Sequence, residues 1–233
     1  MNFLEVNNLK KVYNKIEVVN IPSLIVPFGE SFGLVGNNGA GKTTFFRMIL
    51  DLIKPTDGEV ISKEENVRYS EVWKSYTGSY LDEGFLIDFL TPDEYFSFIG
   101  DINNLSKGDI NEFLDAFAEV FNDEILGKKK YIRDLSKGNQ KKVGIAAALM
   151  INPEIILLDE PFANLDPSTQ IRLKKYLIDI KQQRQVTMLI SSHDLNHVTE
   201  VCERIVVLEK GDIIHDIRTG ENTLKELEEH FAV

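Results

Sequence analysis

The sequence predicts an α/β protein with a mainly parallel core sheet, an N-terminal antiparallel β subdomain and an inserted α-helical subdomain. The first third contains short apolar segments separated by turn residues, the middle has helical patterning, and the last third alternates strands with helices. Such alternation is typical of parallel sheets with helical crossover connections. We expect a single domain of residues 1–233, with an α/β core at about 1–83 and 153–233 and a helical subdomain at about 84–152.

Apolar segments bounded by turn residues predict strands in the first third of the chain. These segments are Phe3–Val6, Ile16–Val19, Ser23–Val26, Ser31–Val35 and Gly58–Ser62. A helix is expected from about Gly41 to Ile53, because its pattern stops before Pro55.

Helices dominate the middle of the chain, and strands return after it. Thr91 followed by Pro92 is typical of a helix start. The expected helices are Pro92–Ile99, Asp109–Phe121, one beginning near Ser136, Ser168–Lys181, Leu195–Val201 and Thr223–Phe231. The expected strands of the last third are Ile155–Leu158, Val186–Ser191 and Ile205–Leu208.

Composition limits the classes of function. The 233 residues are 43% hydrophobic and 27% charged, with a formal net charge of −11, so we expect no nucleic-acid partner. The single cysteine, Cys202, excludes an internal disulfide and suits a reducing cytoplasm. The longest apolar run, Ile145–Ile151, is far shorter than the roughly 20 residues of a membrane-spanning helix. We expect no signal peptide, and a membrane function would need a second chain.

The segment from Gly36 to Thr43 fits the phosphate-binding template of Gly, four residues, Gly-Lys-Ser/Thr. It follows an apolar strand and precedes a helix, which is the context that the motif requires. We expect Lys42 to reach the β- and γ-phosphates and Thr43 to ligate Mg²⁺. The expected phosphate-binding residues are Asn37, Asn38, Gly39, Ala40, Gly41, Lys42, Thr43 and Thr44. The alternative is a glycine-rich turn before an ordinary helix, and the motif favours the fold of P-loop NTPases.

Two carboxylates, Asp159 and Glu160, follow the expected strand Ile155–Leu158. Ligand groups of phosphate-binding folds lie at the carboxyl ends of parallel strands. We expect Asp159 to hold Mg²⁺ and Glu160 to orient and deprotonate an attacking water. Charged residues often end strands, so this pattern gains its weight from the phosphate-binding loop earlier in the chain.

Four further segments resemble motifs of ATP-binding cassette ATPases. Leu135–Lys142 is similar to the signature motif, whose common form is Leu-Ser-Gly-Gly-Gln, and Asn164–Asp166 is similar to the D-loop. His193 resembles the switch histidine, and Tyr13 resembles the aromatic residue that stacks on adenine. The motifs occur in the family order from Phe3 to about Gly220. The chain is identified as a member, closest to the ATPase subunits of bacterial export-type transporters.

This resemblance implies ATP and Mg²⁺ as cofactors and a dimer that binds two ATP molecules head to tail. Ser136 and Gly138 would bind the γ-phosphate held by a second subunit. His193 would contact the γ-phosphate and link hydrolysis to Asp166 across the interface. Lys42, Glu160 and His193 are therefore the expected catalytic residues. Alternatives are that Ser136 only caps a helix, that His193 is a surface histidine, and that Tyr13 only packs in an edge strand.

Two departures from the family pattern stand out. Lys137 and Asn139 occupy signature positions where the common form has Gly and Gln. The glutamine that usually precedes the helical subdomain is replaced by Asp82 or Glu83, with the correspondence open by one residue. Either carboxylate could ligate Mg²⁺, and Asp82 is the residue that we select as the candidate ligand.

The resemblance implies the ATP-hydrolysing subunit of a transporter, cytoplasmic and peripheral on the inner face of the cell membrane, with export as the expected direction. Its partners would be a separate transmembrane permease and a second ATPase, either an identical copy or a paralogue. A groove near Glu83–Phe89 would receive the permease, although Phe85 and Phe89 could equally be core residues. The main rival is a soluble cassette ATPase of an assembly complex. DNA-associated ATPases and non-enzymatic ATP-binding regulators fit the sequence less well.

Overall fold

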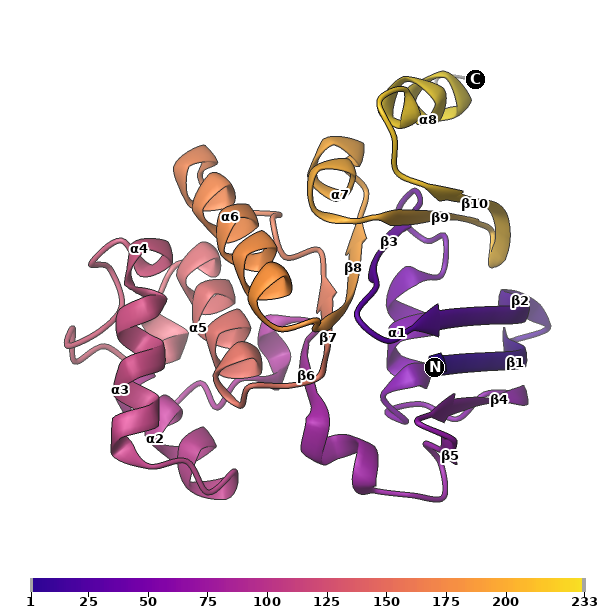
Figure 1. The fold of residues 1–233 in the computed structure, drawn as a ribbon. Helices are drawn as coiled ribbons and strands as arrows, with labels where there is room; N and C mark the ends of the chain where they lie inside the picture. Colours follow the sequence, from indigo (N-terminus) through magenta and orange to yellow (C-terminus); the bar gives the residue numbers. More distant parts are fainter. Residues whose placement is uncertain (1, 232–233) are drawn as a thin grey trace.

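The computed structural model of the chain describes residues 2–231. Within this range the strands form one sheet in the order β5-β4-β1-β2-β10-β9-β3-β8-β7-β6 (Figure 1). The strands are β1 Asn2–Tyr13, β2 Ile16–Pro27, β3 Ser31–Val35, β4 Asp57–Ser62, β5 Glu65–Asn66, β6 Thr77–Tyr80, β7 Ile155–Asp159, β8 Thr187–Ser192, β9 Arg204–Glu209 and β10 Asp212–Arg218.

Helices cover the sheet on both faces. The α-helices are α1 Lys42–Ile49, α2 Pro92–Ile102, α3 Lys107–Ala116, α4 Ala118–Phe121, α5 Lys137–Met150, α6 Pro167–Gln183, α7 Leu195–Val201 and α8 Thr223–Phe231. Short 3-10 helices occupy Val72–Tyr76, Glu83–Phe85 and Ile132–Asp134. In the described residues, none of the helices combines the length and the apolar character that crossing a bilayer requires.

The central strands confirm the predicted α/β fold. Strands β6, β7, β8, β3 and β9 are each parallel to their neighbours in that series. Every residue of β3, β7 and β8 is buried. Strands that are covered on both faces need no polar alternation, which is why the sequence carries continuous apolar runs at these places.

The two faces of this sheet have different covers. Ile155 and Leu157 of β7 belong to a buried cluster with Phe45 and Phe46 of α1. Their neighbours Ile156 and Leu158 belong to a second cluster with residues of α5, α6 and α7. Because alternate residues of a strand point to opposite faces, α1 lies on one face and the other three helices lie on the other.

The N-terminal strands are longer than the sequence predicts. Ile16–Val19 and Ser23–Val26 were expected as two strands, but they form the single strand β2. The reason is antiparallel pairing with β1 along almost its whole length, from Asn2 to Tyr13. Pro22 has no paired partner in the β1–β2 ladder, at the point where Asn8 of β1 has a left-handed conformation with φ of 48°, so its missing donor breaks no ladder pair.

Two helix predictions also need correction. Helix α1 ends at Ile49 instead of Ile53, because Asp51 adopts a left-handed conformation with φ of 48°. The helix expected over 109–121 is divided into α3 and α4 at Phe117. The Phe117 ring is fully buried, with centroids 4.8 Å from the Tyr176 ring and 5.0 Å from the Phe121 ring, so packing decides the break.

Helices α2 to α5 gather at the end of the molecule opposite to β1, β2 and β4 (Figure 1). Two of them begin with a reciprocal cap in which a hydroxyl and a carboxylate satisfy each other's backbone amides. Thr91 and Glu94 form this arrangement at α2, and Ser106 and Asp109 form it at α3. The predicted helix start at Thr91 and Pro92 is thereby confirmed.

Candidate functional site

The phosphate-binding loop connects β3 to α1, as its sequence context predicts. Two positions of the loop require glycine, because a Cβ there would collide with neighbouring backbone atoms. A Cβ on Gly36 would lie 2.3 Å from the Leu208 carbonyl oxygen. Gly41, at the helix N-cap, has φ of 110°, and a Cβ there would lie 2.5 Å from the Val18 carbonyl oxygen. The loop can therefore approach β9 and β2 closely before α1 begins.

Helix α1 has no side-chain cap at its N-terminus. Its first internal bond runs from the Phe45 amide to the Gly41 carbonyl, 2.8 Å long. The amides of Lys42, Thr43 and Thr44 precede that bond, so they have no acceptor within the helix. Such a terminus favours a bound anion, because its amides and the helix dipole both attract negative charge.

Lys42 is buried at the start of α1, with 6% of its surface exposed. Its ammonium donates to the Gly36 carbonyl at 2.6 Å and lies 3.5 Å from a carboxylate oxygen of Glu160. The lysine thus joins the loop to the end of β7, and a phosphate placed on the loop would compete with Glu160 for its charge.

Thr43 and Asp159 provide adjacent oxygen atoms. The Thr43 hydroxyl donates to one Asp159 carboxylate oxygen at 2.5 Å, and the Ser191 hydroxyl donates to the other. Burial raises the pKa of Asp159, and the two hydroxyl donors oppose that effect. A hydroxyl and a carboxylate beside a phosphate site form the donor set that Mg²⁺ takes, because this ion binds few protein oxygens and keeps water or phosphate as its other ligands.

Glu160 and His193 meet at the carboxyl edge of the sheet. The His193 Nδ1 lies 2.9 Å from the Glu160 carboxylate, and the glutamate side chain is one quarter exposed. Glu160 has a left-handed backbone with φ of 49°. Its amide donates to the Ser191 hydroxyl at 3.0 Å, which ties the turn after β7 to β8. A carboxylate that is partly exposed and held by an imidazole can accept a proton from a water molecule.

The signature segment and the D-loop segment lie side by side. Ser136 caps α5 by accepting a bond from the Asn139 amide at 3.2 Å. A Cβ on Gly138 would lie 2.7 Å from the Asn164 carbonyl oxygen. Both segments line a shared hollow of about 450 Å³. Asp166 accepts from the Ser168 and Thr169 hydroxyls, and these bonds, with that from the Thr169 amide, hold its pKa well below the ordinary value.

Tyr13 ends β1 with 45% of its surface exposed, so it is not a core residue. The Lys11 ammonium lies 4.9 Å from the centroid of its ring. The position leaves much of the aromatic ring accessible at the tip of the β1–β2 hairpin.

The two acidic residues after β6 have different partners. Asp82 accepts from the Gly84 amide at 2.7 Å, and its other oxygen lies 3.3 Å from the Arg47 guanidinium of α1. Glu83 accepts from the Tyr80 hydroxyl at 3.0 Å. Both carboxylates thus have protein partners, and Asp82 is the one attached to the helix that follows the phosphate-binding loop.

A mainly apolar groove of about 360 Å³ lies between β6 and helices α2 and α5. Phe85 lines it with 54% of its surface exposed, whereas Phe89, with 61% of its surface exposed, is not among its lining residues. The alternative that these two aromatics are core residues is therefore wrong for this structure.

Sequence reasoning missed three residues of this region. Ser191 binds Asp159, Arg47 pairs with Asp82, and Lys141 of α5 donates to the Glu160 carbonyl. The two serines that end the apolar strand β8 were a usable signal for Ser191, because polar residues at the carboxyl end of a buried parallel strand face the site.

Known proteins resemble the chain over nearly its whole length. A family model described as ABC transporter matches residues 19–163. The chain is 34% identical over 229 residues to the uncharacterized ABC transporter ATP-binding protein YhaQ of Bacillus subtilis, covering 98% of this chain and 74% of that protein. It is 33% identical over 229 residues to the bacitracin transport ATP-binding protein BcrA of Enterococcus faecalis, covering 94% of this chain and 70% of that protein. A solved ATP binding subunit of an ABC transporter superposes with a TM-score of 0.83 at 25% identity, covering 99% and 93% of the two chains.

Proposed function

Because the chain belongs to the ABC transporter family as an ATP-binding subunit, we propose that it binds and hydrolyses ATP to power a membrane transporter. The observation that carries the proposal is the meeting of Lys42, Thr43, Asp159, Glu160 and His193 at one edge of the sheet. An accidental P-loop match would not bring a lysine, a hydroxyl, two carboxylates and an imidazole together from three separate segments.

The loop amides and Lys42 would hold the triphosphate, and Tyr13 would stack on the adenine. Thr43 and Asp159 would hold Mg²⁺, which supplies charge neutralisation at the phosphate oxygens when it is bound. Glu160 would take the proton of the attacking water while His193 holds its carboxylate by the 2.9 Å contact. Transfer of Lys42 from Glu160 to the phosphates would free this carboxylate for that role.

The reaction requires a second subunit in this proposal. The hollow shared by the signature and D-loop segments is lined by Ser136, Gly138 and Asp166. The γ-phosphate of a facing subunit would enter that hollow, so that two subunits enclose two ATP molecules head to tail. ATP would favour the closed dimer and hydrolysis would reopen it. The core at 1–83 and 153–233 and the helical subdomain at 84–152 would be the two bodies that move. The second subunit is an identical copy or a paralogue, since this chain carries both halves of the composite site.

A separate permease would occupy the groove beside β6, which would place this subunit on the inner face of the cell membrane. Exposed Phe85 at a mainly apolar groove supports a protein partner there. Export is the direction that we propose, and it rests on the resemblance of the sequence motifs to bacterial export-type subunits. An ATPase of a cofactor or protein assembly complex is the rival function.

The proposal is tested by purifying the subunit from detergent-solubilised membranes of its host and identifying its partners by mass spectrometry. We expect a polytopic membrane protein in near-stoichiometric amount, and MgATP hydrolysis by the complex. Recovery with soluble partners alone would favour the assembly ATPase, and absence of hydrolysis in both fractions would overturn the enzymatic role.

A further inference from the structure

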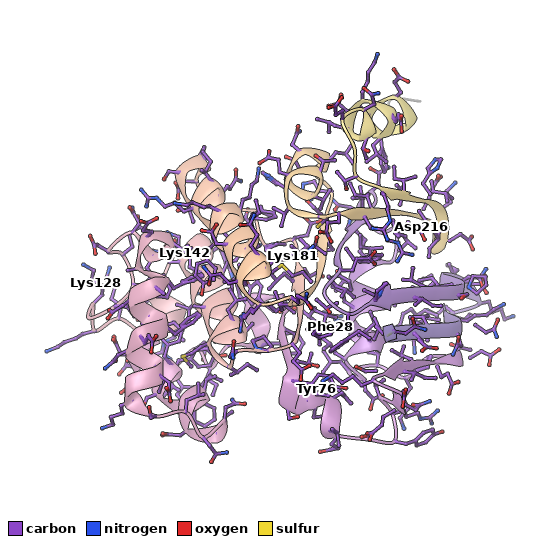
Figure 2. All side chains as sticks on the ribbon, viewed as in Figure 1. Phe28, Tyr76, Lys128, Lys142, Lys181 and Asp216 are labelled. Atoms are coloured by element: carbon purple, nitrogen blue, oxygen red, sulfur yellow. The ribbon has the colours of Figure 1, made fainter. Side chains whose placement is uncertain are left out.

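Lys141 is a buried lysine of α5 that the proposed reaction does not use. Only 4% of its surface is exposed. Its ammonium donates to the backbone carbonyl of Glu160 at 2.7 Å, across from α5 to the turn after β7. The next residue, Lys142, has a different partner and lies 3.0 Å from Glu124 among the helices at the left of Figure 2. Burial of an ammonium is costly unless its bonds are made, so the contact of Lys141 is a specific one.

The backbone that receives this bond is unusual. Glu160 has φ of 49°, a left-handed conformation that residues with a Cβ adopt only when their surroundings hold them. The Ser191 hydroxyl binds its amide at 3.0 Å. On the other side, the Glu160 carbonyl accepts from the Ala163 amide at 3.2 Å and from Lys141. Lys141 is thus the side chain that holds the carbonyl half of the turn.

The charges around Lys141 explain how it can stay in this place. Burial lowers the pKa of Lys141, and the carboxylates of Glu83, Glu160 and Asp159 oppose that effect. These carboxylates come from the segment after β6 and from the end of β7. The lysine compensates negative charge at the point where the proposed general base begins.

We propose that Lys141 is a positioning residue that fixes the direction of the Glu160 carboxylate through the Glu160 carbonyl. Because Lys141 stands five residues after Ser136 on the same helix, the turn that bears Glu160 is tied to the helix that bears the signature segment. Contact of the signature segment of α5 with a facing subunit would therefore determine the orientation of the Glu160 carboxylate in the same chain as that α5. This inference rests on the proposed ATPase function only for its kinetic consequence, since the contact itself exists without nucleotide.

Three variants test the contact. Lys141→Met keeps an unbranched side chain of similar packing but removes the donor, and Lys141→Arg restores a donor. Lys181→Met is the matched control, because Lys181 is also mostly buried and lies near the C-terminal end of α6, where it donates to the Ser31 hydroxyl at 3.0 Å and pairs with Glu203. Lys141→Leu, which also has no donor, replaces the methionine variant if that variant does not fold.

The first measurement is hydrogen–deuterium exchange without nucleotide. We expect faster exchange in the segment 160–164 for Lys141→Met, recovery in Lys141→Arg, and no change there in Lys181→Met. Equal exchange of this segment in all four proteins would overturn the positioning role. This measurement is independent of whether the protein hydrolyses ATP.

The second measurement is the split between kcat and KM for MgATP. We expect kcat of Lys141→Met to fall by about 10- to 100-fold, the scale of a misaimed catalytic group, with KM unchanged. A kcat equal to that of the wild type, or an equal loss in Lys181→Met, would overturn the inference. A wild-type protein without hydrolysis would overturn the proposed function instead, and the exchange result would still decide the contact.

Discussion

The N-termini of α1 and α5 are built differently, although both are expected to face phosphate. Helix α1 begins after Gly41 without a side-chain cap, whereas Ser136 caps α5 through the Asn139 amide. The first terminus has its lysine, its hydroxyl and its carboxylates already assembled. The second has a satisfied amide and a hollow shared with the D-loop segment. From this difference we propose that α1 binds a phosphate within one subunit, while α5 would become a site only when another surface closes on it.

The largest effect should come from the α1 side, at Glu160. Replacement by glutamine removes the base while it keeps the size of the side chain and its contact with His193. We expect kcat for MgATP to fall by about 10²- to 10⁴-fold, the usual contribution of a general base, with ATP binding retained. An ATP-dependent dimer should then accumulate, which size-exclusion chromatography with light scattering measures.

Glu119→Gln is the control for this variant. Glu119 is exposed, and it contacts Arg172 through its backbone carbonyl, which the substitution does not change. Hydrolysis by Glu160→Gln at the rate of the wild type would remove Glu160 from the catalytic residues. It would also remove the main reason to propose that the α1 end carries its catalytic groups within one subunit.

Two single variants test the N-termini of α1 and α5 separately. Lys42→Ala should weaken ATP binding to the monomer by about 10- to 100-fold, because it removes charge-assisted bonds to the phosphates. Ser136→Ala should leave that affinity unchanged, should reduce hydrolysis, and should lower the free energy of unfolding by about 1 kcal/mol through the lost cap.

Titration calorimetry with ATP and urea denaturation measure both quantities. Weakened ATP binding to the monomeric form of Ser136→Ala would contradict the division between the two helix ends, because it would place both of them around one nucleotide in one chain.

The sequence predicts the α1 end better than the α5 end for a physical reason. The phosphate-binding loop is a local structure, in which Gly36, Gly41 and Lys42 carry their functions within eight residues. The buried strands β3, β7 and β8 are likewise local, because burial on both faces gives a continuous apolar run. Asp159 and Glu160 could then be placed from the strand that precedes them.

The remaining contacts depend on tertiary packing. The bond from Lys141 to Glu160 joins segments 19 residues apart, and the ion pair of Arg47 with Asp82 joins segments 35 residues apart. No periodicity specifies which carbonyl a buried lysine meets. The break at Phe117 and the continuity of β2 were missed for the same reason, since a ring contact and a strand ladder overrule the local pattern.

A smaller effect is expected after β6. Asp82→Ala and Glu83→Ala should differ in Mg²⁺-dependent turnover, because Asp82 is paired with Arg47 of α1 whereas Glu83 is bonded to Tyr80. We expect Asp82→Ala to be the more damaging change, with activity that requires more Mg²⁺. A Mg²⁺ titration of turnover measures it, with Asp88→Ala as the control. Equal, near-wild-type turnover in both variants would remove this segment from the candidate site.

The smallest effect concerns Asp166 on the α5 side and depends on pH. Hydrogen bonds from Ser168 and Thr169 depress its folded-state pKa, and the unfolded value is about 3.9. Its ionised form therefore stabilises the folded state above pH 4 or so, and this stabilisation is lost as pH falls through the folded pKa. Asp166→Asn keeps a capping oxygen but cannot ionise. In urea denaturation, we expect the wild type to exceed the variant in stability at neutral pH and the difference to narrow in acid. A stability difference that stays constant with pH would mean that these hydroxyls do not hold the Asp166 carboxylate in solution. Because Asp166 caps α6 beside the hollow shared by the signature and D-loop segments, the D-loop segment would then be less ordered than the α1 end.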